Sequence, residues 1–222
     1  MAERARKATS EGDDELKRRR RNDLLDAALD LFSSRDYYHV SIDQIARKAG
    51  VSKGTVYWYF DSKDELLIGV IEREHGRIGE QLGLVAASDS PAIEKIRALI
   101  DINSWVSAER DRLSRLVIGL LSDPSSELTQ RVLERLRANI EMYCGVAADL
   151  MREASGEATF RGFSHQELAL ALSSCIHGLM IRLRVCPELC DPTRMSALVR
   201  EIFIGPLERG PAPDSPSKEQ KK

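Results

Sequence analysis

The chain has 222 residues, with 33 Lys and Arg against 35 Asp and Glu, so its formal net charge of −2 excludes a uniformly cationic protein. Hydrophobic residues make up 42% of the chain, which is enough for a buried core, and the length suits one small and one larger helical domain. No apolar run approaches the length needed to span a bilayer, and the N-terminus is charged rather than a signal peptide. We therefore expect a globular, cytoplasmic protein.

Positive charge is concentrated near the N-terminus. Residues 17–63 contain ten Lys and Arg against six Asp and Glu, whereas the rest of the chain carries a net charge of −6. Residues 17–21 read KRRRR. This run is either an arm for DNA phosphates or the minor groove, or a solvated helix start that is poorly placed for the helix dipole. The adjacent segments favour the arm.

A helix is predicted over residues 18–34, because apolar residues recur there at spacings of three and four. They are Leu24, Leu25, Ala28, Leu31 and Phe32.

Residues 41–59 predict two short helices joined by a tight turn. Ser41 and Gln44 have the spacing of a capping box, and Gly50 stands where a helix needs a residue that tolerates positive φ in order to end. Ser52 can then cap a second short helix. This is the pattern of a helix-turn-helix.

The second short helix has one buried and one exposed face. Val56 and Phe60, four residues apart, point inward. The outward set combines a cation, a bare backbone, a hydroxyl and aromatic rings, which are the groups that a recognition helix uses in a major groove. It consists of Lys53, Gly54, Thr55, Tyr57 and Trp58.

A third start signal, Ser62 with Glu65, opens a long helix. The stretch from Ala49 to Phe60, followed by Ser62 to Leu66, resembles the TetR family of transcriptional regulators over about residues 20–70. The resemblance implies an all-α protein in which a three-helix head is joined by a long helix to a larger helical bundle. We expect the head to contact double-stranded DNA through Arg20, Arg21, Ser41, Ser52, Lys53, Gly54, Thr55, Tyr57, Trp58, Tyr59 and Lys63.

The rest of the chain predicts further helices. One begins at Pro91, a second carries Leu113 to Leu121, and a long one spans about residues 128–150. Ser164 and Glu167 form another capping box before a strongly apolar helix, and residues 191–192, Asp-Pro, open the last.

The two closing helices have more apolar surface than one core requires, which indicates a two-fold dimer interface. The alternative is that both helices lie centrally in a monomeric bundle. The resemblance implies a homodimer through Leu168, Leu172, Cys175, Leu179, Leu198, Ile202 and Phe203.

The resemblance also implies a largely apolar small-molecule pocket in the body. Large, soft or hydrogen-bonding side chains on apolar helix faces are its candidates, although each is also compatible with plain core packing. They are Trp105, Met142, Tyr143, His177 and Met180.

The sequence favours neither a metal centre nor an enzyme, and no cofactor is expected. Cys186 and Cys190, with His177 nearby, lack the two-residue gap of structural zinc sites, so packing or loop cysteines are favoured. No Gly-rich phosphate loop, GxSxG or HExxH motif is present.

We therefore predict four segments: a disordered or basic arm (1–17), a DNA-binding head (18–65), a ligand-binding and dimerisation body (66–204) and a disordered tail (205–222). The predicted function is that of a repressor released from a palindromic operator by a small molecule. An activator of the same family is one alternative. A helical protein-interaction module without DNA binding is the other, but it leaves the exposed Lys53, Tyr57 and Trp58 unexplained.

Overall fold

A computed structural model of the protein describes residues 2–35, 37–102, 112, 116–120, 123–155, 162–189 and 191–209. The side chains of residues 2–11, 180, 183, 184, 187 and 209 are not part of this description. Every regular element in these ranges is a helix, which confirms the all-α prediction.

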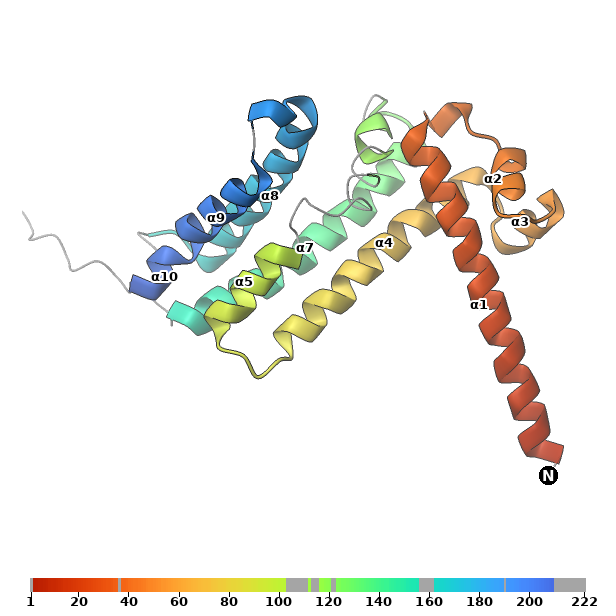
Figure 1. Ribbon diagram of the computed structural model, residues 1–222, viewed down its shortest axis with the longest axis horizontal. Helices are drawn as coiled ribbons and strands as arrows, with labels where there is room; N and C mark the ends of the chain where they lie inside the picture. Colours follow the sequence, from red (N-terminus) through yellow and green to blue (C-terminus); the bar gives the residue numbers. More distant parts are fainter. Residues whose placement is uncertain are drawn as a thin grey trace, which may run out of the picture. The chain divides into compact units, whose positions relative to one another are not determined.

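The N-terminal helices form the predicted three-helix head (Figure 1). Helix α1 spans Ala2–Ser34, a 3₁₀ turn η1 spans Tyr37–His39, and α2 (Ile42–Lys48) and α3 (Lys53–Tyr59) make the helix-turn-helix. Helix α4, Lys63–Ala86, then leaves the head.

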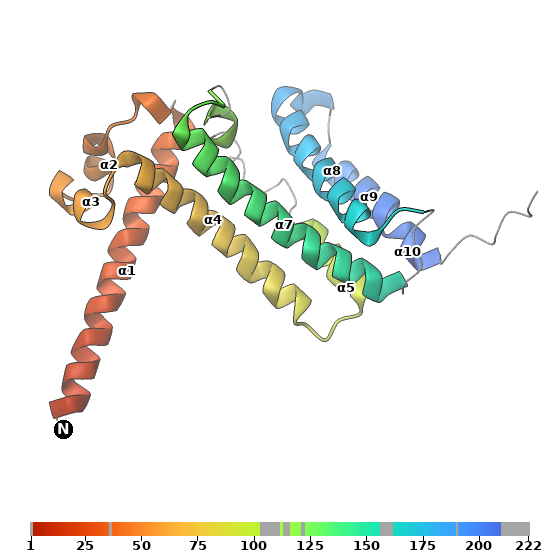
Figure 2. The ribbon, with the colours of Figure 1, turned by 180° about the vertical axis from the view of Figure 1, so that it is seen from behind.

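Helix α1 starts well before its predicted beginning at residue 18, and its N-terminal half extends past α2 and α3 (Figures 1 and 2). Ion pairs one turn apart, Lys17–Asp14 and Arg18–Glu15, support the helix there. Residues 12–23 are exposed, so this part of α1 lacks the packing of a core helix.

The remaining helices are α5 (Ala92–Ile102), α7 (Glu127–Ser155), α8 (His165–Val185), α9 (Pro192–Phe203) and α10 (Gly205–Arg209), with a 3₁₀ turn η2 at Pro187–Leu189. The capping box of Ser164 with Glu167 is present, and Asp191 caps α9 with Pro192 in its first turn. Helix α10 lies where the sequence predicts a disordered tail. Leu207 packs against the core beside it, and Glu208 pairs with Arg97 of α5, which accounts for the added helical turn.

The chain divides into two compact units. Unit 1 comprises Met1–Gly76 and Ala108–Leu136, and unit 2 comprises Arg77–Ser107 and Arg137–Lys222. Helices α4 and α7 both run from one unit into the other. The predicted boundary at residue 65 therefore falls inside unit 1.

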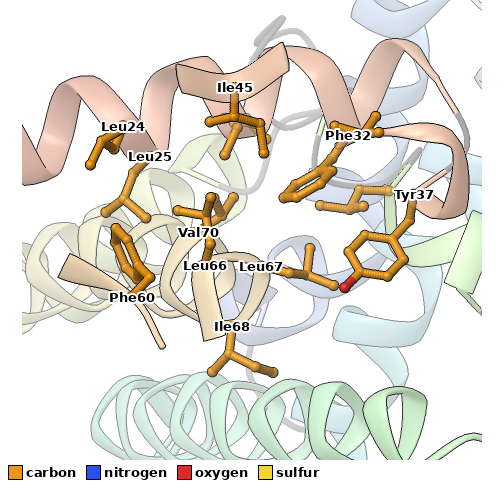
Figure 3. Close-up of a cluster of buried hydrophobic side chains, with 14 of the residues drawn as sticks. Leu24, Leu25, Phe32, Tyr37, Ile45, Phe60, Leu66, Leu67, Ile68 and Val70 are labelled. Atoms are coloured by element: carbon orange, nitrogen blue, oxygen red, sulfur yellow. The ribbon is translucent and has the colours of Figure 1, made fainter. Parts of the chain in front are cut away.

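Each unit has its own buried cluster. In unit 1, Leu25, Phe32 and Ile45 pack against the first two turns of α4, and Ile68 points away from them (Figure 3). In unit 2, Leu82 of α4 belongs to a buried cluster with residues of α5, α7, α8 and α9. The cluster of unit 1 sets the positions of α2 and α3.

Candidate nucleic-acid interface

The helix-turn-helix is built by local capping. Ser41 caps α2 in the predicted box with Gln44, and Gly50, which follows the C-cap residue Ala49, has a φ of 68°. The Ser52 hydroxyl accepts a hydrogen bond from the Thr55 amide at 3.1 Å, which fixes the start of α3. These contacts account for the tight turn between the two helices.

Helix α3 has one fully buried side chain and a largely exposed outer face. Val56 is fully buried, whereas Tyr57 is 48% and Trp58 65% exposed. Tyr59 is half-buried, and its ring contacts that of Trp58 edge to face at 4.5 Å. Two large aromatic rings on a seven-residue helix are costly to leave in water, so this face is suited to a docked partner.

Lys53 stands at the start of this face and already has an anionic partner. Its Nζ donates to Asp43 Oδ2 of α2 at 3.1 Å, and this hydrogen bond, with the carboxylate charge, raises the pKa of Lys53. Both side chains are more than half exposed. Lys53 is therefore a charged side chain that can exchange one anion for another.

Lys63 is predicted to contact DNA, but its side chain forms hydrogen bonds within the head. Its Nζ donates to the carbonyl oxygens of Tyr37 at 3.0 Å and Val40 at 3.1 Å, and it lies 4.1 Å from the centre of the Tyr37 ring. The Tyr37 hydroxyl donates to Asp64. Burial and the Asp64 carboxylate both raise the pKa of Tyr37. These bonds tie the turn before α2 to the first turn of α4.

The basic run lies beside α3 at one position. The Arg21 guanidinium carbon lies 5.1 Å from the centre of the ring of Phe60, the residue that ends α3. Arg20 is exposed on the preceding position. The run thus reaches the C-terminal end of α3 through Arg21, and its contact with DNA stays a prediction.

Two contacts fix α1 against α4 beyond this point. A Cβ on Gly69 would lie 3.0 Å from the Phe60 ring and 3.3 Å from Leu25, so the helices approach closely there. One turn later, Arg73 reaches Asp26 at 2.8 Å and the carbonyl oxygen of Asn22 at 3.1 Å, with its side chain only 9% exposed. Hydrophobic periodicity does not reveal the role of Arg73, because Arg73 is one of several charged residues on α4.

The five predicted ligand residues do not form one site in the described structure. Tyr143 is buried in the core of unit 2, Met142 is exposed beside Gly79, and His177 is exposed with its Nδ1 2.7 Å from the carbonyl oxygen of Ser173. Trp105 and the side chain of Met180 lie outside the described residues. The predicted pocket therefore stays a prediction.

An apolar cavity of about 390 Å³ lies in unit 2, and none of those five residues lines it. Three residues of the predicted dimer interface do: Leu168, Ile202 and Phe203. Glu167 is the one charged residue of its lining, and hydrogen bonds from Ser164 lower the pKa of Glu167 and keep it ionised. The other lining residues are Met151, Phe163, Ala171, Pro206 and Leu207.

The predicted interface residues divide between core and surface. Leu172 is fully buried within its own protomer, so it is not available to a second one. Leu198 and Ile202 are about half exposed on α9. Cys175, Leu179, Leu168 and Phe203 are partly buried against the core of unit 2. The periodicity missed three further exposed apolar residues of α8, Leu170, Ile181 and Val185, because they fall on its less apolar face.

The three cysteines that the structure describes are free thiols that are buried or partly buried. Cys144 is buried and Cys175 half-buried, and burial raises the pKa of both thiols. Cys186 is half-buried, and Cys190 lies outside the described residues. Over the described ranges, no helix is both long and apolar enough to cross a membrane.

A capped helix-turn-helix that presents a cation and two aromatic rings defines a DNA-binding protein of the helix-turn-helix class. Residues 24–70 match the family model described as bacterial regulatory proteins, tetR family. Over these residues the chain matches this family of transcriptional regulators, as the sequence motifs predict.

Two relatives illustrate the extent of the likeness. The chain is 26% identical over 126 residues to the fatty acid metabolism regulator protein of Bacillus subtilis, a match that covers 57% of this chain and 65% of that protein, slightly less than two thirds. It is 26% identical over 202 residues to the HTH-type transcriptional regulator AcrR of Shigella flexneri, covering 86% and 93%. Both relatives are regulators.

Among solved structures, the chain is similar to the transcriptional regulator FadR from Bacillus subtilis in complex with stearoyl-CoA. The TM-score is 0.67 at 22% identity, over 82% of this chain and 96% of that one. This likeness shows a shared fold.

Proposed function

We propose that the protein is a ligand-controlled repressor that binds a palindromic DNA operator as a homodimer in the cytoplasm and is released by a small, largely apolar effector. The observation that carries the proposal is the exposed face of α3, where Lys53, Tyr57 and Trp58 stand outward on a helix fixed by its caps. Major-groove recognition uses such a set.

The dimer is supported by the exposed apolar residues of α8 and α9. Leu170, Ile181, Leu198 and Ile202 each expose about half of their surface. A two-fold interface between copies of these helices removes that surface from water. A dimer also presents two heads to two half-sites, which lie roughly 34–36 Å apart when they are one helical turn apart.

Selection from a random double-stranded DNA library tests DNA recognition. We expect a two-fold symmetric sequence, bound more weakly as salt rises, because neutralised phosphates release counterions. The Tyr57→Ala variant should lose affinity for the selected duplex at unchanged thermal stability, because the side chain faces out. Leu84→Ala on α4, which removes an even more exposed side chain, is the control that should bind normally. Failure to enrich any duplex contradicts the proposal.

The effector is tested on the same duplex. Stearoyl-CoA is the first probe, because a protein of the same fold has been crystallised with it. We expect it to release the duplex at concentrations at which coenzyme A alone does not, since the acyl chain supplies the apolar surface. Equal effects of both molecules would contradict an apolar effector while leaving DNA recognition intact.

A further inference from the structure

The cavity of about 390 Å³ lies at one end of unit 2, where the last turn of α7, the start of α8, the end of α9 and α10 meet (Figures 1 and 2). This volume is within the range of roughly 300–1,000 Å³ over which proteins bind small molecules. Phe163 and Ile202, which line the cavity, are each more than half exposed. A ligand can therefore enter from solvent without the unfolding of a helix.

Polar contacts hold the walls of this cavity in place. His165, in the first turn of α8, is only 7% exposed, and its Nε2 lies 3.0 Å from the hydroxyl oxygen of Ser155 at the end of α7. Glu208 of α10 pairs with Arg97 of α5. The end of α7 is thus tied to the start of α8, and α10 is tied to α5. A site whose walls are already ordered loses less entropy when a ligand binds.

Glu167 supplies the single charge of the lining. Its Oε2 accepts hydrogen bonds from the Ser164 amide and hydroxyl, both at 2.7 Å. These bonds lower the pKa of Glu167, so its carboxylate is ionised at neutral pH. Its Oε1 accepts no hydrogen bond from the residues that the structure describes. One oxygen of a fixed carboxylate is therefore left for a ligand.

The helix ends beside the cavity add little net charge. Helix α7 ends at Ser155, one turn after the lining residue Met151, and α8 begins at His165, between the lining residues Phe163 and Glu167. The negative end of one helix dipole thus lies near the positive end of the other, and their partial charges oppose each other. The Glu167 carboxylate is the dominant charge, so it attracts a cation and repels an anion.

The rest of the lining suits an organic cation rather than a metal ion. Phe163 precedes α8 and Phe203 ends α9, so two aromatic rings reach the cavity from different helices. Aromatic ring faces attract ammonium groups. Leu168 and Leu207 add apolar surface that an alkyl chain or a ring can cover. A divalent metal ion requires several oxygen or nitrogen ligands, whereas this lining offers one carboxylate.

We propose that this cavity binds a small organic cation, an amine or quaternary ammonium on a short apolar body, with the charge beside Glu167 and the body against α7, α9 and α10. The site is separate from the predicted effector pocket, because neither Met142, Tyr143 nor His177 lines the cavity. The inference goes beyond the proposed function, since binding here requires neither DNA nor an effector response.

Calorimetric titration of the full chain tests the site with three probes that share an octyl chain: octyltrimethylammonium, 1-octanol and octyl sulfate, all at concentrations without micelles. We expect the cation to bind about tenfold more tightly than the alcohol, because the carboxylate and the rings each add a few-fold. Octyl sulfate should bind more weakly than the alcohol. Equal affinities for the three probes would overturn the proposal, whatever the outcome of DNA selection.

Glu167→Gln removes the charge and keeps the local structure, because glutamine also serves at this position of a capping box. We expect it to weaken octyltrimethylammonium binding by about threefold to fivefold and to leave 1-octanol binding within about twofold. Glu141→Gln, at an exposed carboxylate of α7 outside the cavity, changes the net charge equally and should alter neither affinity. Equal losses in both variants would assign the preference to the net charge of the protein and contradict the site.

A blocking variant locates the site. Ala171 is exposed and lines the cavity, so Ala171→Phe places a ring in the cavity without disturbing the core. Octyltrimethylammonium and 1-octanol should both lose about tenfold or more in affinity at unchanged thermal stability, because the apolar space is filled. Unchanged binding would place the probes on other exposed apolar residues and overturn the proposal.

A second protomer is the competing occupant of this cavity. Leu168, Ile202 and Phe203 line the cavity and are also predicted to contact a second copy of the chain. Sedimentation with and without octyltrimethylammonium separates the two occupants. We expect assembly to be unchanged by the cation. A shift toward monomers would assign the cavity to the dimer interface and contradict the proposal.

Discussion

Lys53 and Lys63 lie ten residues apart in the same head, yet their surroundings differ completely. Lys53 is exposed beside one carboxylate, whereas Lys63 donates to two backbone carbonyl oxygens and covers an aromatic ring. Lys53 is the first residue of α3 and Lys63 the first residue of α4, and the motif alone assigns them the same role. The difference arises from the η1 turn, whose carbonyl groups reach Lys63 only after the chain has folded.

Replacing Lys63 should therefore affect stability, whereas replacing Lys53 should affect DNA binding. Lys63→Ala leaves the carbonyl oxygens of Tyr37 and Val40 without this donor, which should lower the free energy of unfolding by about 1–3 kcal/mol. Lys53→Ala should leave stability unchanged and weaken binding to all duplexes, with a flatter dependence on salt. Urea denaturation and salt-titrated band shifts measure the two effects. A Lys63→Ala protein of full stability would contradict the assignment.

The Tyr37–Asp64 bond predicts a loss of stability in alkali. Burial and Asp64 raise the pKa of Tyr37 in the folded protein above the value of about 10 in the unfolded chain. The folded state therefore holds the Tyr37 proton more tightly than the unfolded chain does. The contribution of this hydroxyl to the free energy of unfolding is complete below pH 10 and declines as the pH rises above it. In the Tyr37→Phe variant, the free energy of unfolding should fall less steeply between pH 8 and 11 than in the unaltered chain, as measured by urea denaturation. Parallel curves would contradict the prediction.

At the scale of elements, the contact between α1, α3 and α4 depends on Gly69. Alanine there would improve helix propensity by about 1 kcal/mol, but its Cβ would press on the Phe60 ring and on Leu25. Because Phe60 ends α3 inside a packed core, we expect the overpacking to dominate, with a net loss of about 1 kcal/mol and weaker DNA binding. Thermal unfolding measures the loss. Gly76→Ala, on the same helix without such neighbours, is the control and should not destabilise. A stabilised Gly69→Ala protein would show that the Phe60 and Leu25 side chains shift to accommodate the added Cβ at little cost.

The ends of the helices can be predicted from the sequence wherever a capping side chain marks them. Ser41, Ser52, Ser164 and Asp191 cap the helices that they were expected to cap, because capping depends on side chains within three residues. Helices that depend on contacts distant in sequence are harder to predict. Helix α10 depends on packing and an ion pair with a residue about a hundred positions away, and no local pattern reports that.

At the scale of the whole molecule, the exposed face of α8 and α9 predicts how the protein assembles. Leu198→Glu places a carboxylate on a side chain that is 49% exposed in one protomer. If that face is the dimer interface, the charge becomes buried without a partner, and the protein should shift toward monomers by at least tenfold in dissociation constant. Leu84→Glu, at a more exposed leucine on α4, should leave assembly unchanged. Sedimentation at micromolar concentration distinguishes them, and a Leu198→Glu dimer of normal affinity would place the interface elsewhere.

The sequence predicts some parts of the candidate sites better than others. The recognition face was read from the sequence because α3 is short and its caps fix which side chains point outward. The interface and pocket were not, because an apolar stripe does not reveal which side faces the core. Leu172 and Leu198 illustrate this limit: both continue an apolar pattern, yet one is buried in its own protomer and the other is exposed.

The Lys53–Asp43 pair gives the head an internal competitor for phosphate. A phosphate that approaches Lys53 meets a cation whose charge the Asp43 carboxylate already partly compensates, so the lysine gains less from any arbitrary duplex than a solitary cation would. A sequence that also satisfies Tyr57 and Trp58 offsets that loss, whereas random DNA does not. If Lys53 contacts DNA as proposed, the Asp43 carboxylate should therefore favour duplexes that also contact Tyr57 and Trp58 over arbitrary ones.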